Sequence, residues 1–338
     1  MKKTEKILKT PLSLLSGIYG AGTFLHRKFT RQRGVEAAVI SVGNITSGGT
    51  GKTPLVINIV EHLQELELDN STAILSRGYG RKSGKYKVIE KIPDIDEAGD
   101  EVKFLKEKFP HIPVFLGRNR YKSAAAAVKY GARIIILDDG FQSWELARDK
   151  NIGVIDATDP FGGGALIPAG RLREPVSSLK RADSVVINRC GQAGNEKLEK
   201  IKEKIYKIRK DLKIFTGVEK LKEFKELWGR RRTGASHFRG KKILALSGIG
   251  NPKGFYNLLE SAGLNIECKF EYRDHYRWSD KELNEIASFA YREGLKIIAT
   301  QKDAARFSPG SGINGWEAVM KLEITEKNQW KKYLKENI

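Results

Sequence analysis

The sequence predicts an α/β fold, with a doubly wound, mostly parallel sheet, a second smaller α/β lobe and an N-terminal interfacial helix. Over residues 34–190, apolar runs of strand length alternate with amphipathic helical runs, which is typical of a sheet covered by helices on both faces. The apolar run at 133–140 does not alternate with polar residues, as expected for a buried parallel strand. With 338 residues, the chain is long enough for two lobes.

The elements of the first lobe follow from local patterns. The run "AAVISV" ends in a glycine-rich loop, and "PLVINIVEHLQEL" after it repeats apolar residues at helical spacing. Pro54 falls in the first helical turn, where its missing N–H removes no intrahelical hydrogen bond. Strands are expected at 37–42, 71–75, 112–117 and 133–140, and helices at 54–66, 100–109 and 119–131.

The remainder of the chain continues this alternation. Between residues 151 and 190, the short strands "IGVIDA" and "SVVINR" surround the glycine-rich loop "DPFGGGALIPAGRLREP". A Lys/Glu-rich surface helix and a strand are expected within 195–230, and a second α/β unit is expected from 241–255 to a strand at 295–300. The simplest division is an N-terminal helix with a basic flank at 1–33, a core at 34–190, a basic linker or surface segment at 191–240 and a second lobe at 241–338.

The net charge of +20 is concentrated in two regions. Residues 1–33 contain eight Lys or Arg and one acidic residue, and residues 195–242 contain seventeen basic and seven acidic residues. A membrane surface or a nucleic acid would attract such regions. The basic residues of the second region also fit an ordinary solvated helix face.

Cysteine usage excludes two small-protein classes. The chain has two cysteines, Cys190 and Cys268, and they form no CxxC motif and have no His-rich surroundings. Neither a disulfide framework nor a zinc site is therefore expected, and a reducing cytoplasm fits this composition.

An apolar segment near the N-terminus, "TPLSLLSGIYGAGTFL", has lysines before it and Lys or Arg after it. As a helix it would span about 24 Å, less than the ~30 Å hydrocarbon core, so it should not cross a membrane. The dense positive charge after it also argues against an export signal. Leu12, Leu15, Ile18 and Tyr19 can share a face, which favours a helix lying in the membrane interface. The alternative is a helix packed on its own domain.

The segment "GNITSGGTGKTP" at 43–54 is close to a phosphate-binding loop. The usual pattern is Gly, four residues and Gly-Lys-Ser/Thr, and Thr46 stands where the first glycine is expected. The later glycines still allow successive backbone N–H groups to face phosphates at the positive end of the following helix. Lys52 would reach the β and γ phosphates, and the Thr53 hydroxyl would bind Mg²⁺. The flanking strand and helix favour nucleotide binding over an ordinary turn.

Two adjacent carboxylates, Asp138 and Asp139, follow four apolar residues at the expected end of a strand. The carboxyl ends of parallel strands are where such folds bind ligands. Two aspartates in one loop can also be turn formers. Together with the phosphate-binding loop, they are interpreted as residues that hold Mg²⁺, directly or through water.

The motifs leave the class of phosphate-loop protein open. A GTPase needs Asn-Lys-x-Asp after a strand, and "VVINRCG" supplies Asn188 without the Lys or the Asp. A kinase needs a base for the acceptor hydroxyl. Candidates for this base are Asp100 in "AGDEV", Asp274 and His275 in "YRDHYRWSD", and Glu174 in "GRLREP".

Seven short motifs occur in order along the chain, namely "SVGNITSGGTGKTP", "SRGYGR", "GDE", "DDGFQ", "LREP", "DHY" and "TQKDAARF". In their order and spacing, over roughly residues 10–310, the chain resembles the tetraacyldisaccharide 4'-kinase family of the lipid A pathway. The family's loop also lacks the first glycine, so Thr46 is a shared feature by this comparison. The family is a membrane-surface P-loop kinase that transfers the ATP γ-phosphate to the 4'-hydroxyl of a tetraacylated disaccharide 1-phosphate.

The resemblance implies roles for particular residues. Asp100 matches the family's proposed base and His275 its partner, with Lys52 on the phosphates. ATP is expected on Thr46, Ser47, Gly48, Gly49, Thr50, Gly51, Lys52 and Thr53. Mg²⁺ is expected near Thr53, Asp138, Asp139 and Glu174. Arg77, Arg81, Arg171 and Arg173 resemble positions suited to phosphate or substrate contacts, and Gln301 in "TQKDAARF" stands where Glu is more usual.

The residue patterns and the resemblance agree on a lipid substrate at a membrane surface. Such a substrate explains an interfacial helix flanked by cations, because the enzyme and the acyl chains must meet at one plane. We therefore expect a peripheral protein at the cytoplasmic face of the inner membrane, with no nucleic-acid partner. A P-loop GTPase or metallochaperone-type switch, and a nucleic-acid-binding protein that uses the basic regions, are the alternatives.

Overall fold

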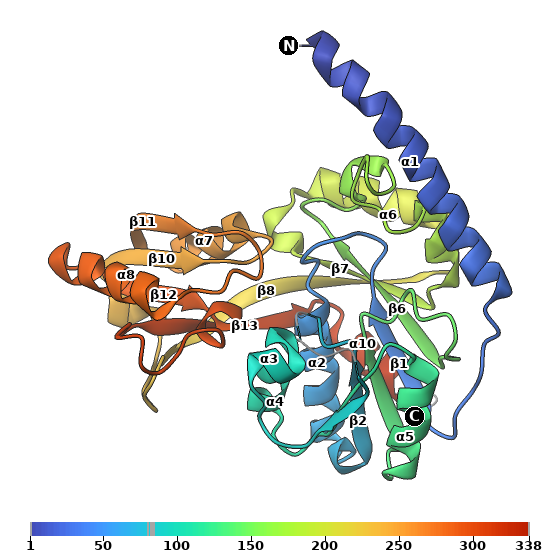
Figure 1. Ribbon diagram of the computed structural model, residues 1–338, viewed down its shortest axis with the longest axis horizontal. Coiled ribbons are helices and arrows are strands. Elements are labelled where there is room, and N and C mark those ends of the chain that lie inside the picture. The colour runs from blue at the N-terminus through green and yellow to red at the C-terminus, as the bar shows by residue number, and fades with distance from the viewer. Residues whose placement is uncertain (1, 80, 82–84, 337–338) are drawn as a thin grey trace.

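A computed structural model describes residues 2–79, 81 and 85–336, with side chains in the N-terminal helix described from residue 12 onward. In this part of the chain the strands form one thirteen-stranded sheet that runs through both lobes (Figure 1). The strand order is β11-β10-β12-β13-β8-β7-β6-β1-β5-β2-β4-β3, and β9 pairs with β8. Most neighbours are parallel, and the predicted α/β class with a mostly parallel sheet is confirmed.

The first lobe has the predicted alternation of strands and helices. Its strands are β1 (Ala38–Gly43), β2 (Thr72–Ser76), β3 (Lys87–Ile89), β4 (Val114–Leu116), β5 (Ile134–Asp138), β6 (Lys150–Asp156) and β7 (Ser184–Asn188). Its helices are α2 (Lys52–Glu65), α3 (Ile95–Ala98), α4 (Asp100–Lys108), α5 (Arg120–Lys129) and α6 (Asn195–Ile208). β3 pairs antiparallel at the edge of the sheet, and the other strand pairs within this lobe are parallel.

The second lobe is a smaller α/β unit. Its strands are β8 (Lys213–Glu226), β9 (Arg232–Thr233), β10 (Lys242–Ser247), β11 (Asn265–Glu271), β12 (Lys296–Thr300) and β13 (Trp316–Ile324). Its helices are α7 (Pro252–Ser261), α8 (Asp280–Arg292) and α9 (Gln301–Ala304), and α10 (Lys327–Lys335) follows β13. Short 3-10 turns lie at Asp69–Ser71, Gly162–Gly164, Val176–Arg181, Cys190–Gln192 and Ala235–Phe238.

Two long strands, β8 and β13, connect the lobes (Figure 1). The start of β8 pairs parallel with β7 of the first lobe, and the rest of β8 pairs antiparallel with β13. Because β13 runs back toward the first lobe, α10 after it packs there, with Trp330, Tyr333 and Leu334 in the same apolar cluster as α2. The C-terminal end of the segment expected at 241–338 therefore returns to the first lobe, and the 191–240 segment contains a strand shared by both lobes.

The core of the first lobe explains why the phosphate-binding segment has a fixed position. The apolar residues of β5 are buried on both faces, and Leu55, Ile59 and Leu63 of α2 pack fully buried against the sheet. Burying side chains of this size contributes about 1.5–3 kcal/mol each. A well-packed strand and helix on either side of the 43–52 turn hold that turn in place.

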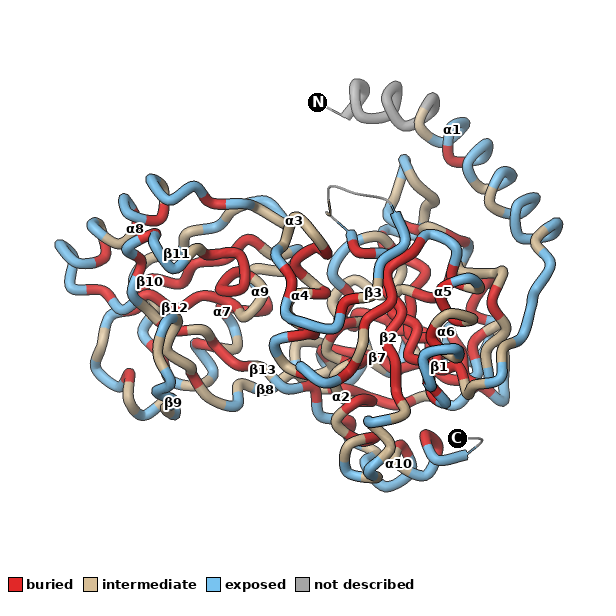
Figure 2. Tube along the Cα trace, turned by 60° about the horizontal axis from the view of Figure 1, so that its bottom comes forward, coloured by how far each residue is buried: buried red, intermediate tan, exposed pale blue. Residues whose placement is uncertain are grey.

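The N-terminal helix α1 (Lys2–Phe29) projects along the first lobe, and most of its surface faces outward (Figure 2). It contacts the body through Ser16, whose hydroxyl donates to the Leu166 carbonyl at 2.8 Å, and through His26, whose ring packs edge-on against Trp144. The exposed large apolar side chains on α1 are Leu14, Leu15, Ile18, Tyr19, Phe24, Leu25 and Phe29. None of the helices in the described part of the chain has the length and apolar character that crossing a membrane requires.

Candidate active site

The phosphate-binding segment forms a tight turn between β1 and α2. Gly48 and Gly51 have φ values of 98° and 90°, which L-residues with side chains rarely adopt. A Cβ on Gly51 would lie 1.9 Å from the Asn188 amide nitrogen, so the position has no room for one. Asn188 is the last residue of β7, and its side-chain amide also faces the Thr50 carbonyl at 3.5 Å. Asn188 of β7 thus holds the turn in place, and the N-terminus of α2 follows the turn directly.

Thr46 lies beneath the loop. Its hydroxyl accepts a hydrogen bond from Asn44 at 3.3 Å, and the same buried amide reaches the Thr50 hydroxyl at 2.8 Å. Thr46 also forms an isolated bridge with Leu172, which ties the turn to the loop at 161–172. Ser47 and the next six residues line a cavity beside the loop, and Thr46 is not among the residues that line it. The residue in place of the first glycine therefore braces the loop from behind.

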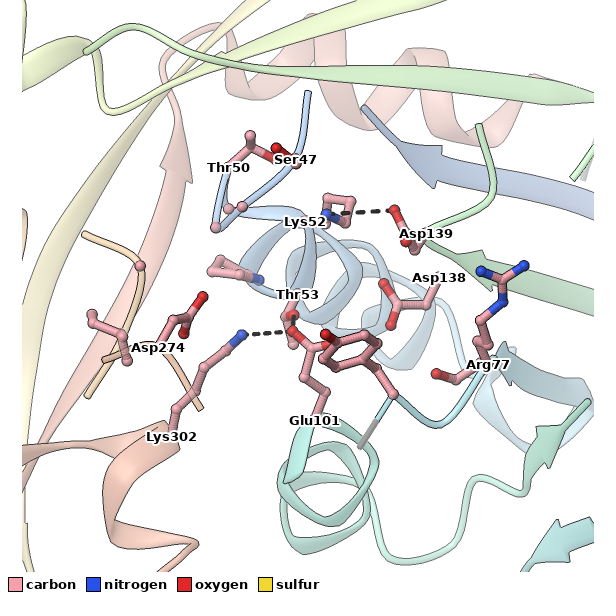
Figure 3. Close-up of a pocket in the computed structure, with 18 of the residues that line it drawn as sticks. Ser47, Thr50, Lys52, Thr53, Arg77, Glu101, Asp138, Asp139, Asp274 and Lys302 are labelled. Carbon is pink, nitrogen blue, oxygen red and sulfur yellow. Dashed lines mark hydrogen bonds and ion pairs between the residues drawn. The ribbon is translucent and has the colours of Figure 1, made fainter. Parts of the chain in front are cut away.

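Lys52 points toward the aspartates that follow β5 (Figure 3). Its ammonium lies 3.4 Å from Asp139 and 3.4 Å from the Asn44 amide oxygen. Arg173 pairs with the same carboxylate, because its Nη1 donates to the two oxygens of Asp139 at 3.0 and 2.9 Å. Burial alone would raise the pKa of Asp139, but the two cations reverse the shift and lower it. Asp139 is therefore ionised and can fix the direction of Lys52.

Asp138 is a buried carboxyl group in acidic surroundings. Burial raises its pKa to about 7, and the nearby charges of Glu101 and Asp139 add to this effect. The Thr53 hydroxyl lies 3.4 Å from Glu101, so a hydroxyl and several carboxylates meet beside the loop. Burial and the two neighbouring carboxylates disfavour the ionised form of Asp138, and a bound cation would offset that cost.

These residues fit a magnesium ion that is bound mainly through phosphates. In the part of the chain that the structure describes, no three or more His, Cys, Asp or Glu side chains are grouped to hold a metal by themselves. Mg²⁺ usually retains water and takes one or two carboxylates together with phosphate oxygens. The Thr53 hydroxyl and the carboxylates of Asp138 and Asp139 supply this type of donor.

Asp100 and His275 meet across the two lobes. Asp100 begins α4, and its Oδ2 lies 2.9 Å from His275 Nδ1, on the loop after β11. The same oxygen accepts from Arg306 Nε at 2.9 Å, and its Oδ1 accepts from the Glu101 backbone N–H at 2.9 Å. Burial would raise the pKa of Asp100, but the hydrogen bond with His275 and the charge of Arg306 lower it strongly. The hydrogen bond with Asp100 in turn raises the pKa of His275 above its ordinary 6.5.

A second ion pair crosses between the lobes beside this contact. Lys302 of α9 donates to Glu101 at 2.7 Å, as the dashed line in Figure 3 marks. The charge of Lys302 is the main reason that the pKa of Glu101 is lowered. The second lobe also reaches the phosphate-binding loop, because a Cβ on Gly250 would lie 3.4 Å from the Gly49 nitrogen.

One cavity of about 1030 Å³ is lined by residues of both lobes. It is lined by the phosphate-binding loop, by Asp138 and Asp139, and by His275 from the second lobe. It is also lined by Tyr19, Thr23, His26 and Thr30 of α1 and by Arg77, Arg118, Asn119 and Arg120. A single space thus extends from the phosphate-binding loop to the helix whose outer surface is apolar.

The four arginines expected near phosphate lie in different surroundings. Arg77 and Arg173 line the cavity. Arg171 donates to the Ser47 carbonyl at 2.8 Å and pairs with Asp159, so it braces the phosphate-binding loop. Arg81 is partly buried and is not among the residues that line the cavity, and burial lowers its pKa.

Glu174 lies apart from the other residues expected near the metal. It is buried, it pairs with Arg181 at 2.8 Å, and it accepts from the Gln142 amide at 2.9 Å. Gln142 lines the cavity and accepts from Arg173 at 3.3 Å, whereas Glu174 does not line the cavity. The carboxylate therefore reaches the site through Gln142.

The site residues that sequence reasoning did not assign are Glu101, Arg120, Gln142, Lys302 and Arg306. Several of them stand inside motifs already recognised, namely "GDE", "DDGFQ" and "TQKDAARF". No local pattern indicates that these side chains face one another. Arg120 stands outside these motifs. It follows Asn119, the N-cap of α5, and its Nη2 lies 3.4 Å from the Asp138 carbonyl, a contact that depends on how the strands are ordered in the sheet.

Asn188, the residue that suggested a guanine-binding motif, is occupied inside the protein. It is fully buried, and its amide donates to Glu219 at 2.9 Å while its carbonyl accepts from the Arg189 backbone. A side chain held in this way cannot read a nucleobase. The GTPase or metallochaperone alternative is not supported.

Comparisons with known proteins agree with the geometry. The family model described as tetraacyldisaccharide-1-P 4'-kinase matches residues 8–338 of the chain. A tetraacyldisaccharide 4'-kinase of Halothermothrix orenii is 38% identical over 326 residues, which cover 90% of this chain and 84% of that protein. One from Elusimicrobium minutum is 34% identical over 327 residues, which cover 93% of this chain and 84% of that protein.

A solved structure has the same architecture. The crystal structure of LpxK from Aquifex aeolicus in complex with ATP matches with a TM-score of 0.73 and 26% sequence identity. The match covers 96% of this chain and 98% of the crystallised chain. The likeness therefore extends over both lobes.

Proposed function

The chain belongs to the tetraacyldisaccharide-1-P 4'-kinase family, and on that premise we propose which residues carry out the transfer. It is a kinase of lipid A biosynthesis that moves the γ-phosphate of ATP to the 4'-hydroxyl of tetraacyldisaccharide 1-phosphate. The observation that carries the assignments is the contact between His275 and Asp100, beside the cavity that the phosphate-binding loop lines.

On the nucleotide side, the loop from Ser47 to Thr53 holds the phosphates of ATP. Its backbone N–H groups and the N-terminus of α2 favour negative charge. Lys52 neutralises charge on the transferred phosphoryl group, and its contacts with Asn44 and Asp139 keep its long side chain directed at that group. Thr46 and Arg171 support the loop from behind.

We assign Mg²⁺ to Thr53, Asp138 and Asp139, directly or through water. When bound, the ion would neutralise negative charge that develops during the transfer. The surroundings of Asp138 support this assignment, because burial and the nearby charges of Glu101 and Asp139 together raise its pKa to about 7, and a bound cation would offset this effect. Glu174 is not assigned as a ligand of the ion. It contributes through Gln142, from whose side-chain amide it accepts a hydrogen bond.

On the acceptor side, we assign the proton of the 4'-hydroxyl to His275 Nε2, and not to Asp100, which the family resemblance indicated as the base. Asp100 is ionised and can only accept, so His275 must donate from Nδ1 and leave Nε2 free to receive a proton. Both carboxylate oxygens of Asp100 already accept from fixed donors, and Asp100 does not line the cavity. The hydroxyl oxygen then bonds to the γ-phosphorus as the bond to the bridging oxygen of ADP breaks. Asp100 orients the imidazole and stabilises its charged form.

The substrate occupies the end of the cavity next to α1. Arg77 lines the cavity and is suited to the sugar or its phosphate. The acyl chains leave toward α1, whose exposed apolar residues lie in the membrane interface at the cytoplasmic face of the inner membrane. Each large apolar side chain that leaves water there contributes up to about 1.5–3 kcal/mol to binding. The protein is thus a peripheral membrane enzyme.

The transfer is tested with ATP, Mg²⁺ and the tetraacyl disaccharide in detergent micelles, with the product identified by mass spectrometry and the phosphate position by NMR. The 4'-phosphorylated disaccharide is expected. The variant His275→Gln should lose most turnover and retain ATP binding. A His275→Gln enzyme with wild-type kcat would contradict the proton-acceptor role.

Membrane association is tested separately by liposome flotation. The double variant Leu15→Glu/Ile18→Glu places two charges on the exposed surface of α1 and should abolish flotation with anionic vesicles. Tyr291→Glu is the matched control, because Tyr291 is 89% exposed on the second lobe. Equal flotation of the double variant and the control would refute the interfacial role of α1.

A further inference from the structure

We propose that Arg306 is a positioning residue for the transfer, and that it fixes the Asp100 carboxylate so that Asp100 can orient His275. This inference rests on the proposed function, because it specifies how the proton-accepting pair is held. It also assigns a role to the end of "TQKDAARF", which no part of the mechanism above uses.

The contacts of Arg306 form a buried fork. Its Nε donates to Asp100 Oδ2 at 2.9 Å, and its Nη2 contacts the same oxygen. Its Nη1 donates to Asp303 Oδ1 at 3.0 Å and to the Gly248 carbonyl at 2.9 Å. The side chain of Arg306 is 2% exposed, so water does not compete for these donors. A planar guanidinium with several fixed acceptors has one orientation.

The frame behind Arg306 belongs entirely to the second lobe. Asp303 is fully buried and accepts from the Thr300 hydroxyl at 2.7 Å and from the Gly248 backbone N–H at 3.0 Å. These bonds connect the ends of β10 and β12, which are neighbouring parallel strands. Arg306 is therefore anchored to the sheet of one lobe and reaches a carboxylate of the other.

Arg306 and His275 contact the same oxygen of Asp100. Both side chains come from the second lobe, and both contact Asp100 Oδ2, with Nη2 of Arg306 and Nδ1 of His275 3.4 Å apart. Without the guanidinium, the carboxylate could rotate about its side-chain bond and release Nδ1. Lys302, four residues earlier, pairs with Glu101 next to Asp100, so one short segment holds two adjacent residues of α4. The contact of Asp100 with His275 thus depends on the packing of the two lobes against each other.

Two substitutions and one control separate positioning from simple stability. Arg306→Gln removes the charge and the fork, and Arg306→Lys retains the charge without the fork. Arg277→Gln is the control, because Arg277 pairs with Asp96 at 2.5 Å across the same lobe boundary, on the exposed surface. Melting temperatures identify any general loss of folding, which Arg306→Gln risks by leaving Asp303 without its cation.

The first measurement is the kinetics of micelle phosphorylation. We expect Arg306→Gln to lower kcat by about 10²-fold, as misplacement of a reacting group does, with the KM for ATP changed less than about twofold. Arg306→Lys should recover part of the lost kcat, and Arg277→Gln should stay within about twofold of wild type. Wild-type kcat in folded Arg306→Gln would overturn the proposal.

The second measurement needs no substrate and is the titration of His275 by NMR, assigned with His275→Gln. The groups that face this imidazole are Asp100, Asp274, Arg306 and the ring of Tyr79. Because the hydrogen bond with Asp100 is the largest cause that raises the pKa of His275, loss of that contact in Arg306→Gln should move the titration to lower pH. Removal of the Arg306 charge with the contact between Asp100 and His275 intact would move the titration to higher pH, and a purely structural role would leave it in place; either result would overturn the proposal. If the wild-type protein does not phosphorylate the disaccharide, the proposed function fails, and this titration still decides whether Arg306 holds the pair.

Discussion

The two polar clusters of the site are built in different ways. The phosphate cluster of Lys52, Asp138 and Asp139 belongs to the first lobe, with Lys52 at the start of α2 and the two aspartates at the C-terminal end of β5. The proton-accepting cluster joins Asp100 of the first lobe to His275 and Arg306 of the second. Each cluster includes a non-glycine residue with positive φ, Asp139 at 50° and His275 at 59°. Backbone strain of this kind persists where the surroundings hold it.

This difference separates binding from transfer. The phosphate cluster does not need the second lobe for its main contacts, so nucleotide binding should survive changes at the lobe boundary. The proton-accepting cluster exists only when the lobes are docked, so those changes should affect kcat. Separate readouts of ATP binding and turnover can therefore distinguish the two clusters.

The largest effect is expected inside the phosphate cluster. Lys52→Ala removes the cation aimed at the transferred phosphoryl group and leaves Asp139 with one cation fewer, so kcat/KM should fall by about 10³-fold. Single-turnover phosphorylation measures this loss. Lys122→Ala, an exposed lysine of α5, is the control and should behave as wild type. A loss below about tenfold for Lys52→Ala would remove Lys52 from the proposed mechanism.

The proton-accepting cluster should show a smaller and non-additive loss. Asp100→Asn and His275→Gln are each expected to lower kcat by about 10²-fold, because each disables the same proton transfer. The double variant should be little worse than either single variant, as for residues that act as a unit. Fully additive losses in this double-mutant cycle would indicate that Asp100 and His275 act independently.

The pH dependence of kcat/KM sharpens the same assignment. Neutral His275 accepts the proton, so activity should fall as pH drops through its folded pKa, which Asp100 raises above 6.5. Asp100→Asn removes that carboxylate charge, so the acidic limb should move to lower pH. The control is Arg277→Gln, whose profile should match wild type. A limb that stays in place in Asp100→Asn would exclude His275 as its origin.

The smallest effect concerns the stability of the loop. Gly51→Ala introduces a Cβ against Asn188 at a φ of 90°, and it should lower the free energy of unfolding by about 1–3 kcal/mol. Gly49→Ala is matched to it, because a Cβ there meets no atom within 4 Å and its φ is not in the left-handed region. Urea unfolding of both variants tests this, and equal stabilities would show that Asn188 does not constrain the loop.

Local patterns were sufficient for the phosphate-binding half of the protein. The strands, the glycine-rich loop and α2 lie in one continuous stretch, and their hydrophobic spacing indicates both the elements and the fold class. β5 delivers Asp138 directly from an apolar run. The α8 helix was not placed, although Ser279 and Glu282 form a capping box that marks its start.

The sequence by itself determined the α/β class and indicated the nucleotide loop, because those depend on short-range spacing. Only the tertiary structure decided that Thr46 lies behind the loop, that Glu174 pairs with Arg181, and that Arg306 meets Asp100 over a sequence separation of 206 residues. Such contacts depend on β8 and β13 joining the lobes in one sheet. Local periodicity in the sequence does not indicate these long-range contacts, because they are set by the packing of the whole molecule.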